Sequence, residues 1–159
     1  MSELQHKLQF FVKNEIETGE LALKLAEIAE PKDVIALIGG LGAGKTVFAR
    51  SFITAITCDV EVPSPTFTLV QIYEGLTTNI YHFDLFRIRH SDEIFELGIE
   101  DAINDGVSLI EWPDRMGPYL PNERLEIILS NGEDTNTRKI SYCGFGDKWK
   151  KKLAKLSVQ

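Results

Sequence analysis

Apolar residues recur along the chain with two different spacings. Residues 34–38 are apolar without alternation, which is typical of a parallel strand that helices cover on both faces. Farther on, Phe48, Phe52 and Ile56 recur at steps of four, which predicts an amphipathic helix over residues 45–56. The glycine-rich segment between the two therefore lies at a junction from a buried strand to a helix.

Strand and helix patterns alternate over the rest of the chain. Residues 8–12 predict a first strand, and Thr18 is the expected N-cap of a helix that Pro31 closes. Ser91 is the expected cap of a helical stretch that Gly98 interrupts, and a final helix is predicted over residues 148–156. Later strands are predicted at residues 67–73, 79–83, 107–110, 124–130 and 138–142. The first two of these later strands pair around a turn and the last two form a hairpin. The sequence thus predicts an α/β sandwich with a mixed sheet.

The length of the chain fits one folded unit. A chain of 159 residues is near the usual size of a single domain, so one domain over residues 1–159 is expected. Residues 1–12 mix charged with apolar side chains, which excludes a signal-peptide core or membrane span there and favours a cytoplasmic protein without a membrane partner. Cys58 and Cys143 have neither metal-ligand nor CxxC spacing, and we assign them no role.

Charge is distributed unevenly along the chain. The net charge is −7, but residues 145–159 hold five lysines and one aspartate, while the rest of the chain holds 12 basic and 23 acidic side chains. The body therefore carries −11 and the tail +4. An acidic body repels a phosphate backbone, so tight binding to nucleic acid is disfavoured unless the tail or a partner provides the attraction.

Residues 39–46, Gly-Gly-Leu-Gly-Ala-Gly-Lys-Thr, match the Walker A motif at every fixed position. Small residues let such a loop curl so that successive backbone N–H groups point at a phosphate, and the following helix directs its positive end to the same place. A β-carbon at Gly42 or Gly44 is expected to obstruct that approach. We therefore predict an ATP site in which Lys45 contacts the β- and γ-phosphates and the Thr46 hydroxyl ligates Mg²⁺. The residues expected to bind the nucleotide are Gly42, Ala43, Gly44, Lys45, Thr46 and Val47.

Two acidic residues are candidates for the γ-phosphate end of this site. Glu111 follows the predicted strand 107–110, where P-loop enzymes need a carboxylate that holds magnesium or a water in its shell. The alternative is a solvent-facing acid at a strand end. Asp84 ends another predicted strand and could position water or sense the γ-phosphate, or it could form a local ion pair with Arg87.

Three further residues near these acids have weaker signals. Thr66, in a Ser-Pro-Thr stretch where a closing segment could be hinged, could hold the magnesium or its water, although such a stretch is usually only a turn. Trp112 would lie by the nucleotide, or else in the core. His82 is expected to be packed rather than catalytic.

Four segments together carry a family pattern: GAGKT at residues 42–46, SPTFTL at 64–69, HFDLFR at 82–87 and EWP at 111–113. In order and spacing they resemble the TsaE family, small bacterial ATPases of tRNA threonylcarbamoyladenosine biosynthesis, over almost the whole chain. The resemblance implies a P-loop NTPase-like three-layer sandwich whose central sheet is mixed and mostly parallel. Gly40 departs from the aspartate that the family often has before the leucine of this loop.

The resemblance also implies a biological role. Members act in the cytosol with the TsaB and TsaD proteins, which place threonylcarbamoyl on the adenosine next to the anticodon, and ATP hydrolysis is thought to reset that complex. Contact with tRNA would then be indirect, through the complex. Carried onto this chain, Lys45 and Thr46 take phosphate and magnesium, Glu111 is the acid on the magnesium side, and Thr66 and Asp84 lie in the γ-phosphate region.

Other functions remain open at the level of the sequence. A small-molecule kinase would share the P-loop, but such kinases add a lid and an arginine cluster, and the six arginines here are dispersed. A GTPase is disfavoured because no N-K-x-D stretch occurs. A nucleotide-dependent adaptor would overlap with the family role. Since no arginine is obviously placed as a finger, we expect hydrolysis to be slow alone and faster with partners.

Two charged segments could bind a partner or could be ordinary surface. Residues 92–105 contain six carboxylates and no basic residue, which fits either a basic partner or a solvated helix face. The lysines of residues 148–155 could contact tRNA or a partner, or they could coat a terminal helix that packs through Trp149.

Overall fold

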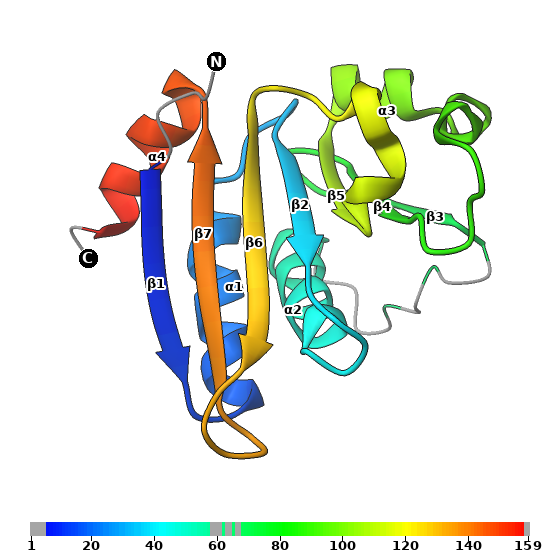
Figure 1. The fold of residues 1–159 in the computed structure, drawn as a ribbon. Helices are drawn as coiled ribbons and strands as arrows, with labels where there is room; N and C mark the ends of the chain where they lie inside the picture. The colour runs from blue at the N-terminus through cyan, green and yellow to red at the C-terminus, as the bar shows by residue number, and fades with distance from the viewer. Residues whose placement is uncertain (1–5, 58–61, 63–64, 66–67, 158–159) are drawn as a thin grey trace.

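The computed structural model describes residues 6–57, 62, 65 and 68–157, and its centre is a seven-stranded sheet (Figure 1). The strands are β1 (His6–Val12), β2 (Val34–Ile38), β3 (Val70–Tyr73), β4 (Ile80–Asp84), β5 (Val107–Glu111), β6 (Arg124–Asn131) and β7 (Arg138–Phe145). The α-helices are α1 (Glu15–Ile28), α2 (Lys45–Thr57), α3 (Ile99–Asp105) and α4 (Asp147–Ser157), and two 3₁₀ segments are η1 (Ser91–Leu97) and η2 (Pro113–Tyr119).

The strand order is β1-β7-β6-β2-β5-β4-β3. The four central strands β6, β2, β5 and β4 are parallel to one another, whereas β7 and β1 on one side and β3 on the other join antiparallel. This confirms the predicted mixed sheet with a parallel centre. The carboxyl ends of β2 and β6 lie at the lower end of the sheet in Figure 1, where β2 continues into the glycine-rich loop and β6 into the β6–β7 loop.

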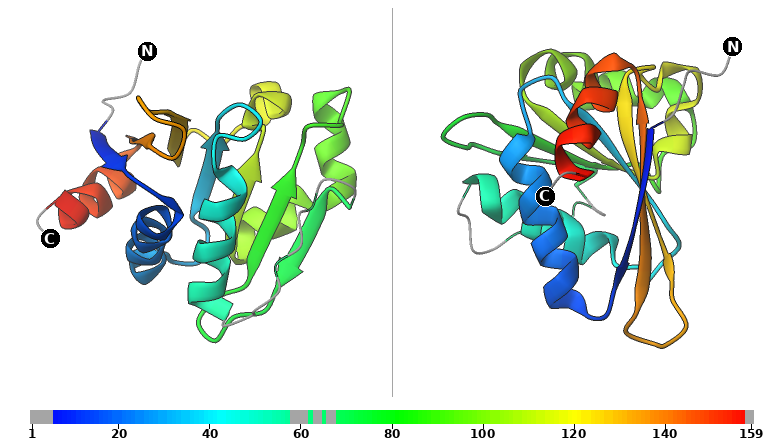
Figure 2. Two further views of the ribbon diagram at one scale, coloured as in Figure 1. Left: turned by 90° about the horizontal axis from the view of Figure 1, so that it is seen from below. Right: turned by 90° about the vertical axis from the view of Figure 1, so that its left-hand side faces the viewer.

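Helices cover both faces of this sheet (Figure 2). Ile35 and Leu37 of β2 belong to a buried cluster that includes side chains of α1, α2 and α4, while Val34 belongs to a second cluster with side chains of η1, α3 and η2. Because neighbouring residues of a strand point to opposite faces, one apolar strand can serve both clusters. The three-layer arrangement is therefore confirmed, with β2 and its loop at its centre.

The predicted N-cap of the first helix is wrong, because the cap is Asn14 rather than Thr18. The Asn14 side chain accepts a hydrogen bond from the Glu17 N–H at 2.9 Å, and the Glu17 carboxylate accepts one from the Lys13 N–H at 2.8 Å. These two hydrogen bonds, one to the cap side chain and one to the residue before the cap, start α1 one turn earlier. The apolar spacing does not reveal that first turn because Ile16 is exposed. The start of α1 therefore lies at the same end of the sheet as the glycine-rich loop.

Ser91 is likewise not a cap, since His90 holds the N-cap position of η1 and Ser91 is its first residue. The backbone N–H groups of Arg89 and His90 both donate to the Glu93 carboxylate at 2.6 Å, which fixes this start. The predicted interruption at Gly98 is confirmed: this residue has φ 78°, ends η1 and lets α3 begin. The segment is thus two short helices rather than one.

The C-terminal helix α4 is packed against the sheet instead of being a free basic tail. Trp149 and Leu153 are completely buried in the same cluster as α1 and α2. Lys150, Lys151 and Lys155 are exposed, as a lysine-coated surface helix requires. The structure therefore bears out packing through Trp149, and it leaves only the outer lysines available to a partner.

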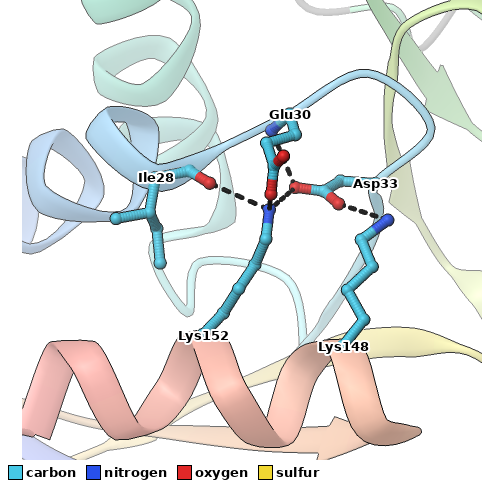
Figure 3. A network of polar contacts seen from close by, with 5 residues as sticks. All are labelled: Ile28, Glu30, Asp33, Lys148 and Lys152. Atoms are coloured by element: carbon cyan, nitrogen blue, oxygen red, sulfur yellow. Dashed lines mark hydrogen bonds and ion pairs between the residues drawn. The ribbon is translucent and has the colours of Figure 1, made fainter.

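An ionic network joins α4 to the start of β2, the strand that leads into the Walker A loop, or P-loop, of residues 39–46 (Figure 3). Asp33, which is fully buried just before β2, contacts the ammonium groups of Lys148 and Lys152, each at 2.6 Å. The Lys152 ammonium also donates to the Ile28 carbonyl at 2.9 Å and contacts the Glu30 carboxylate at 2.8 Å. All three of its N–H groups thus have an oxygen partner, which offsets the burial of the charge.

None of the helices in the described part of the chain combines the length and the apolar character that crossing a bilayer requires.

Candidate nucleotide-binding site

The glycine-rich loop leaves the carboxyl end of β2 and enters α2, whose first residue is Lys45. Gly42 and Gly44 have φ values of 78° and 103°, which only glycine adopts without strain. A β-carbon built on Gly42 would meet no atom within 4 Å, and one on Gly44 would lie 3.7 Å from a Leu129 methyl group. Within the chain itself the two glycines are therefore required by backbone conformation rather than by lack of space.

Lys45 is buried, with 6% of its surface exposed, and its ammonium has no hydrogen-bond partner among the described residues. The nitrogen lies 3.8 Å from the centre of the Trp112 ring, a cation–π arrangement. Burial lowers the pKa of the Lys45 ammonium, and the nearby carboxylates of Glu111, Asp84 and Asp114 oppose that shift. A buried cation without an oxygen partner, at a helix N-terminus, is arranged to receive an anion.

A cavity of about 670 Å³ opens beside this lysine. It is lined by residues of the loop and α2, by the ends of β4 and β5, by the first turn of α1 and by the β6–β7 loop: Asn14, Glu15, Ile16, Thr18, Leu41, Gly42, Gly44, Lys45, Thr46, Val47, Asp84, Glu111, Trp112, Asn136 and Arg138. Seven residues predicted for the site are thus brought together: Gly42, Gly44, Lys45, Thr46, Val47, Asp84 and Glu111. Ala43 is instead buried in the apolar cluster that contains α1 and α2, and it is not among the residues that line the cavity.

Asp84 and Glu111 are direct partners in the parallel pairing of β4 with β5, so the two carboxylates stand side by side on one face of the sheet. Both are buried, with 5% and 6% of their surface exposed. The Asp84 carboxylate accepts a hydrogen bond from the Phe86 N–H at 3.1 Å. The alternative of a solvent-facing acid at position 111 is therefore wrong.

Trp112 is half-buried, and it both lines the cavity and packs against the second apolar cluster, so the two alternatives for this residue hold together. Its backbone is in the left-handed region, with φ 59°, and its ring packs against Phe86 with 4.9 Å between ring centres. Thr66, predicted to act near the γ-phosphate, lies outside the described residues. Its place relative to the cavity stays a prediction.

The cavity also includes residues that sequence reasoning missed. Arg138, at the start of β7, donates to the Gly42 carbonyl at 3.4 Å and to the Thr135 and Thr137 carbonyls. Arg138 therefore lies beside the P-loop, although the residues that adjoin this loop in the sequence include no arginine before Arg50. Asn14 reaches the cavity because α1 begins earlier than predicted, and the Asn14-x-x-Glu17 capping pattern was the signal that could have shown it.

The donor set fits a magnesium ion bound together with a nucleotide. Among the described residues, no three His, Cys, Asp or Glu side chains gather into a metal site of their own. Mg²⁺ in nucleotide sites usually takes one or two protein oxygens and completes its shell with phosphates and water. The exposed Thr46 hydroxyl and the Glu111 carboxylate line the same cavity and supply oxygen donors of that kind.

Comparisons with known proteins identify relatives of this chain. The sequence model of the family described as "Threonylcarbamoyl adenosine biosynthesis protein TsaE" matches residues 12–140. The tRNA threonylcarbamoyladenosine biosynthesis protein TsaE of Bacillus subtilis is 34% identical over 152 residues, which cover 95% of this chain and 94% of that protein. The protein of the same name from Rickettsia felis is 41% identical over 119 residues, 74% of this chain and 70% of that protein.

A solved structure has the same fold. The crystal structure of Bacillus subtilis YdiB superimposes with a TM-score of 0.82 and 31% sequence identity, and the match covers 99% of this chain and 98% of that one. Residues 12–140, which match the family model, contain the P-loop, Asp84, Glu111 and Arg138. On the family match and the relatives together, the chain belongs to the TsaE family.

Proposed function

We propose that this chain binds ATP with Mg²⁺ in the cavity beside the P-loop and hydrolyses it slowly, in the pathway that places threonylcarbamoyl on the adenosine next to the anticodon of tRNA. The observation that carries the proposal is the buried Lys45 ammonium, which lacks a hydrogen-bond partner among the described residues and faces a cavity shared with Asp84 and Glu111. A buried cation without an anion lowers stability, and the phosphates of ATP supply the missing partner.

In this proposal each residue of the site has a separate role. Backbone N–H groups of the loop and the start of α2 bind the phosphates, and Lys45 adds a point charge. Thr46 and Glu111 hold Mg²⁺, which when bound neutralises charge on the β- and γ-phosphates. Asp84, fixed by the Phe86 N–H, orients the attacking water. Thr66 is proposed to contribute at the γ-phosphate end.

The remaining cavity suits the nucleoside part of ATP. Its volume of about 670 Å³ lies within the range of about 300–1,000 Å³ that is usual for small-molecule sites. Asn14 and Ile16 of α1 and Arg138 of β7 line the part built by elements other than the P-loop. These residues supply an amide, an apolar side chain and a cation, which together can hold a base, a ribose and a phosphate.

Membership of the TsaE family supports a specific cellular role for ATP hydrolysis by this chain. We infer that the chain acts in the cytoplasm with TsaB and TsaD proteins and reaches tRNA through them. Its acidic body disfavours tRNA binding on its own. Membership of the TsaE family favours this function over a small-molecule kinase, which was the main alternative. Faster release of free phosphate than of a phosphorylated acceptor, over a panel of acceptors, would support that choice.

Nucleotide binding is tested by replacing Lys45. In calorimetric titrations with ATP and Mg²⁺, Lys45→Ala is expected to weaken binding by roughly 10- to 100-fold, because a charge-assisted hydrogen bond contributes about 1.5–3 kcal/mol. Lys24→Ala, which removes an exposed lysine from α1, is the matched control and should bind like the unchanged chain. Equal ATP affinity in the two variants would contradict the proposed site.

The pathway is tested in cells and with purified partners. Depletion of the protein should remove threonylcarbamoyladenosine from cellular tRNA, and Lys24→Ala but not Lys45→Ala should restore it. Addition of TsaB and TsaD should raise the rate of ATP hydrolysis. Unchanged tRNA modification after depletion, or equal hydrolysis with and without the two proteins, would reject the role in this pathway.

A further inference from the structure

His82 is a buried polar residue for which the proposed mechanism has no use. It lies in β4 two residues before Asp84, so both side chains point to the same face of the sheet. Its pairing partner in β5 is Leu109, two residues before Glu111, which places His82, Asp84 and Glu111 on that same face. Leu109 packs in the cluster that contains α2, so the face is the one next to the P-loop helix.

The imidazole of His82 contacts the Glu111 carboxylate directly. Its Nε2 lies 2.7 Å from Glu111 Oε2, and the two side chains are 3% and 8% exposed. With Glu111 ionised, its carboxylate can only accept a hydrogen bond, and the donor is then the Nε2–H of His82. The other ring nitrogen, Nδ1, has no hydrogen-bond partner among the described residues. The ring therefore directs its hydrogen bond to Glu111 and to no second side chain in that part of the chain.

This contact decides which oxygen of Glu111 remains for a ligand. Oε2 is occupied by the imidazole, and Oε1 is left for the cavity that Glu111 lines. A carboxylate without such a donor can rotate about its last torsion, because that torsion has broad minima. Groups that hydrogen-bond a metal-ligating carboxylate from behind commonly fix its orientation, and their loss weakens metal binding by roughly 10- to 100-fold.

We propose that His82 is a positioning residue that holds the Glu111 carboxylate so that Oε1 serves Mg²⁺ or a water of its shell. The inference rests on the proposed function, in which Glu111 is the acid on the magnesium side. It differs from simple packing, because a packed histidine needs only its shape, whereas a positioning histidine needs the donor at Nε2.

Three substitutions separate the donor from the shape. The amide nitrogen of Gln stands the same number of bonds from the Cα as His Nε2, that of Asn is one bond closer, and Leu has no donor. Binding of the non-hydrolysable analogue AMP-PNP is measured in EDTA and at increasing Mg²⁺ concentration. In EDTA the variants should bind like the unchanged chain. The Mg²⁺ midpoint should rise roughly 10- to 100-fold in His82→Leu and His82→Asn, and His82→Gln should restore it.

Controls distinguish this inference from the proposed function. His6→Gln, on the edge strand β1, should leave the Mg²⁺ midpoint unchanged. If Glu111→Ala also leaves it unchanged, the metal role of Glu111 fails, and the proposed function fails with it. If Glu111→Ala raises the midpoint but His82→Leu does not, only the role of His82 is refuted. In a Glu111→Ala background, His82→Leu should cause no further rise, since the residue acts through Glu111.

A measurement on the unchanged chain decides the matter even if the substitutions prevent folding. Nitrogen-15 spectra of labelled histidine report which ring nitrogen carries the proton. The proposal requires a proton on Nε2 of His82, both without ligand and with AMP-PNP and Mg²⁺. A proton on Nδ1 alone would overturn it, because Nε2 could then not donate to Glu111.

Discussion

Replacing Lys152 by Met tests the ionic network that joins α4 to the P-loop strand. Met keeps the length of the buried stem, so the change removes mainly the charge. Asp33, which is fully buried, keeps Lys148 at 2.6 Å as its other ion-pair partner. Breaking a buried pair by removing one partner lowers the free energy of unfolding by about 3–5 kcal/mol. Because Lys148 remains as a partner, we expect a loss of about 3 kcal/mol, at the lower end of this range. Glu30 is largely exposed and adds little.

The assay is urea unfolding followed by the fluorescence of Trp149, which is buried in the same helix. For a chain of 159 residues, a loss of about 3 kcal/mol also lowers the melting temperature by roughly 6–12 °C. Lys151→Met, at an exposed position of α4, is the matched control and should change stability by less than about 0.5 kcal/mol. If Lys152→Met destabilises no more than Lys151→Met, the reasoning about the buried network is refuted.

The same network predicts a dependence on pH. A hydrogen bond from Lys152 lowers the pKa of the Glu30 carboxyl group, and the charges of Lys152, Lys148 and Lys155 act in the same direction. A lowered folded-state pKa gives stability that is present above the unfolded-state pKa and is lost as pH falls through the folded value. In Lys152→Met the Glu30 pKa, measured by NMR, should rise. An unchanged value would show that the contact does not persist in solution.

Three further outcomes are expected. Trp112 fluorescence should change when ATP binds, because Lys45 must leave its ring for the phosphates, and a signal that persists in Trp112→Phe would reject this. Gly39→Ala should destabilise by about 1–3 kcal/mol, since its Cβ would lie 2.8 Å from a backbone carbonyl oxygen of β6, whereas Gly40→Ala, whose Cβ meets nothing within 4 Å, should be nearly neutral in thermal unfolding. Burial raises the pKa of the Cys143 thiol, so in a Cys58→Ser chain a disulfide reagent should label it slowly at neutral pH and faster at higher pH, and labelling as fast as in urea would contradict this.

Local patterns in the sequence were sufficient for the centre of the fold. The apolar run of β2, the glycine loop and the stripe of α2 are contiguous, so their order and type follow from short-range spacing. The start of α1 was placed one turn late, because exposed Ile16 hides the first turn and the cap is a side-chain pattern rather than an apolar one. Boundaries set by hydrogen bonds are therefore less visible in a sequence than elements set by burial.

The candidate site divides in the same way. The P-loop and the acids at strand ends could be predicted because each is tied to a local pattern. Arg138 could not, since it is 96 residues from the Gly42 carbonyl that it contacts. The contact of His82 with Glu111 depends on the register of β4 against β5, which a single sequence does not specify. Long-range register is thus the information that only the structure adds.

The pairing of the first strand with the last has a consequence for biosynthesis. β1 leaves the ribosome before β7, its partner, which pairs His6 with Gly144 and Val12 with Arg138, so β1 stays unpaired until more than 120 further residues have been made. Until then it is an unpaired edge, which is open to wrong association. Arg138 and α4 arrive at the same late moment. The cavity beside the Walker A loop is therefore completed only after Asn136 and Arg138 have been made, and a chain terminated before β7 would carry an intact Walker A sequence without the complete cavity.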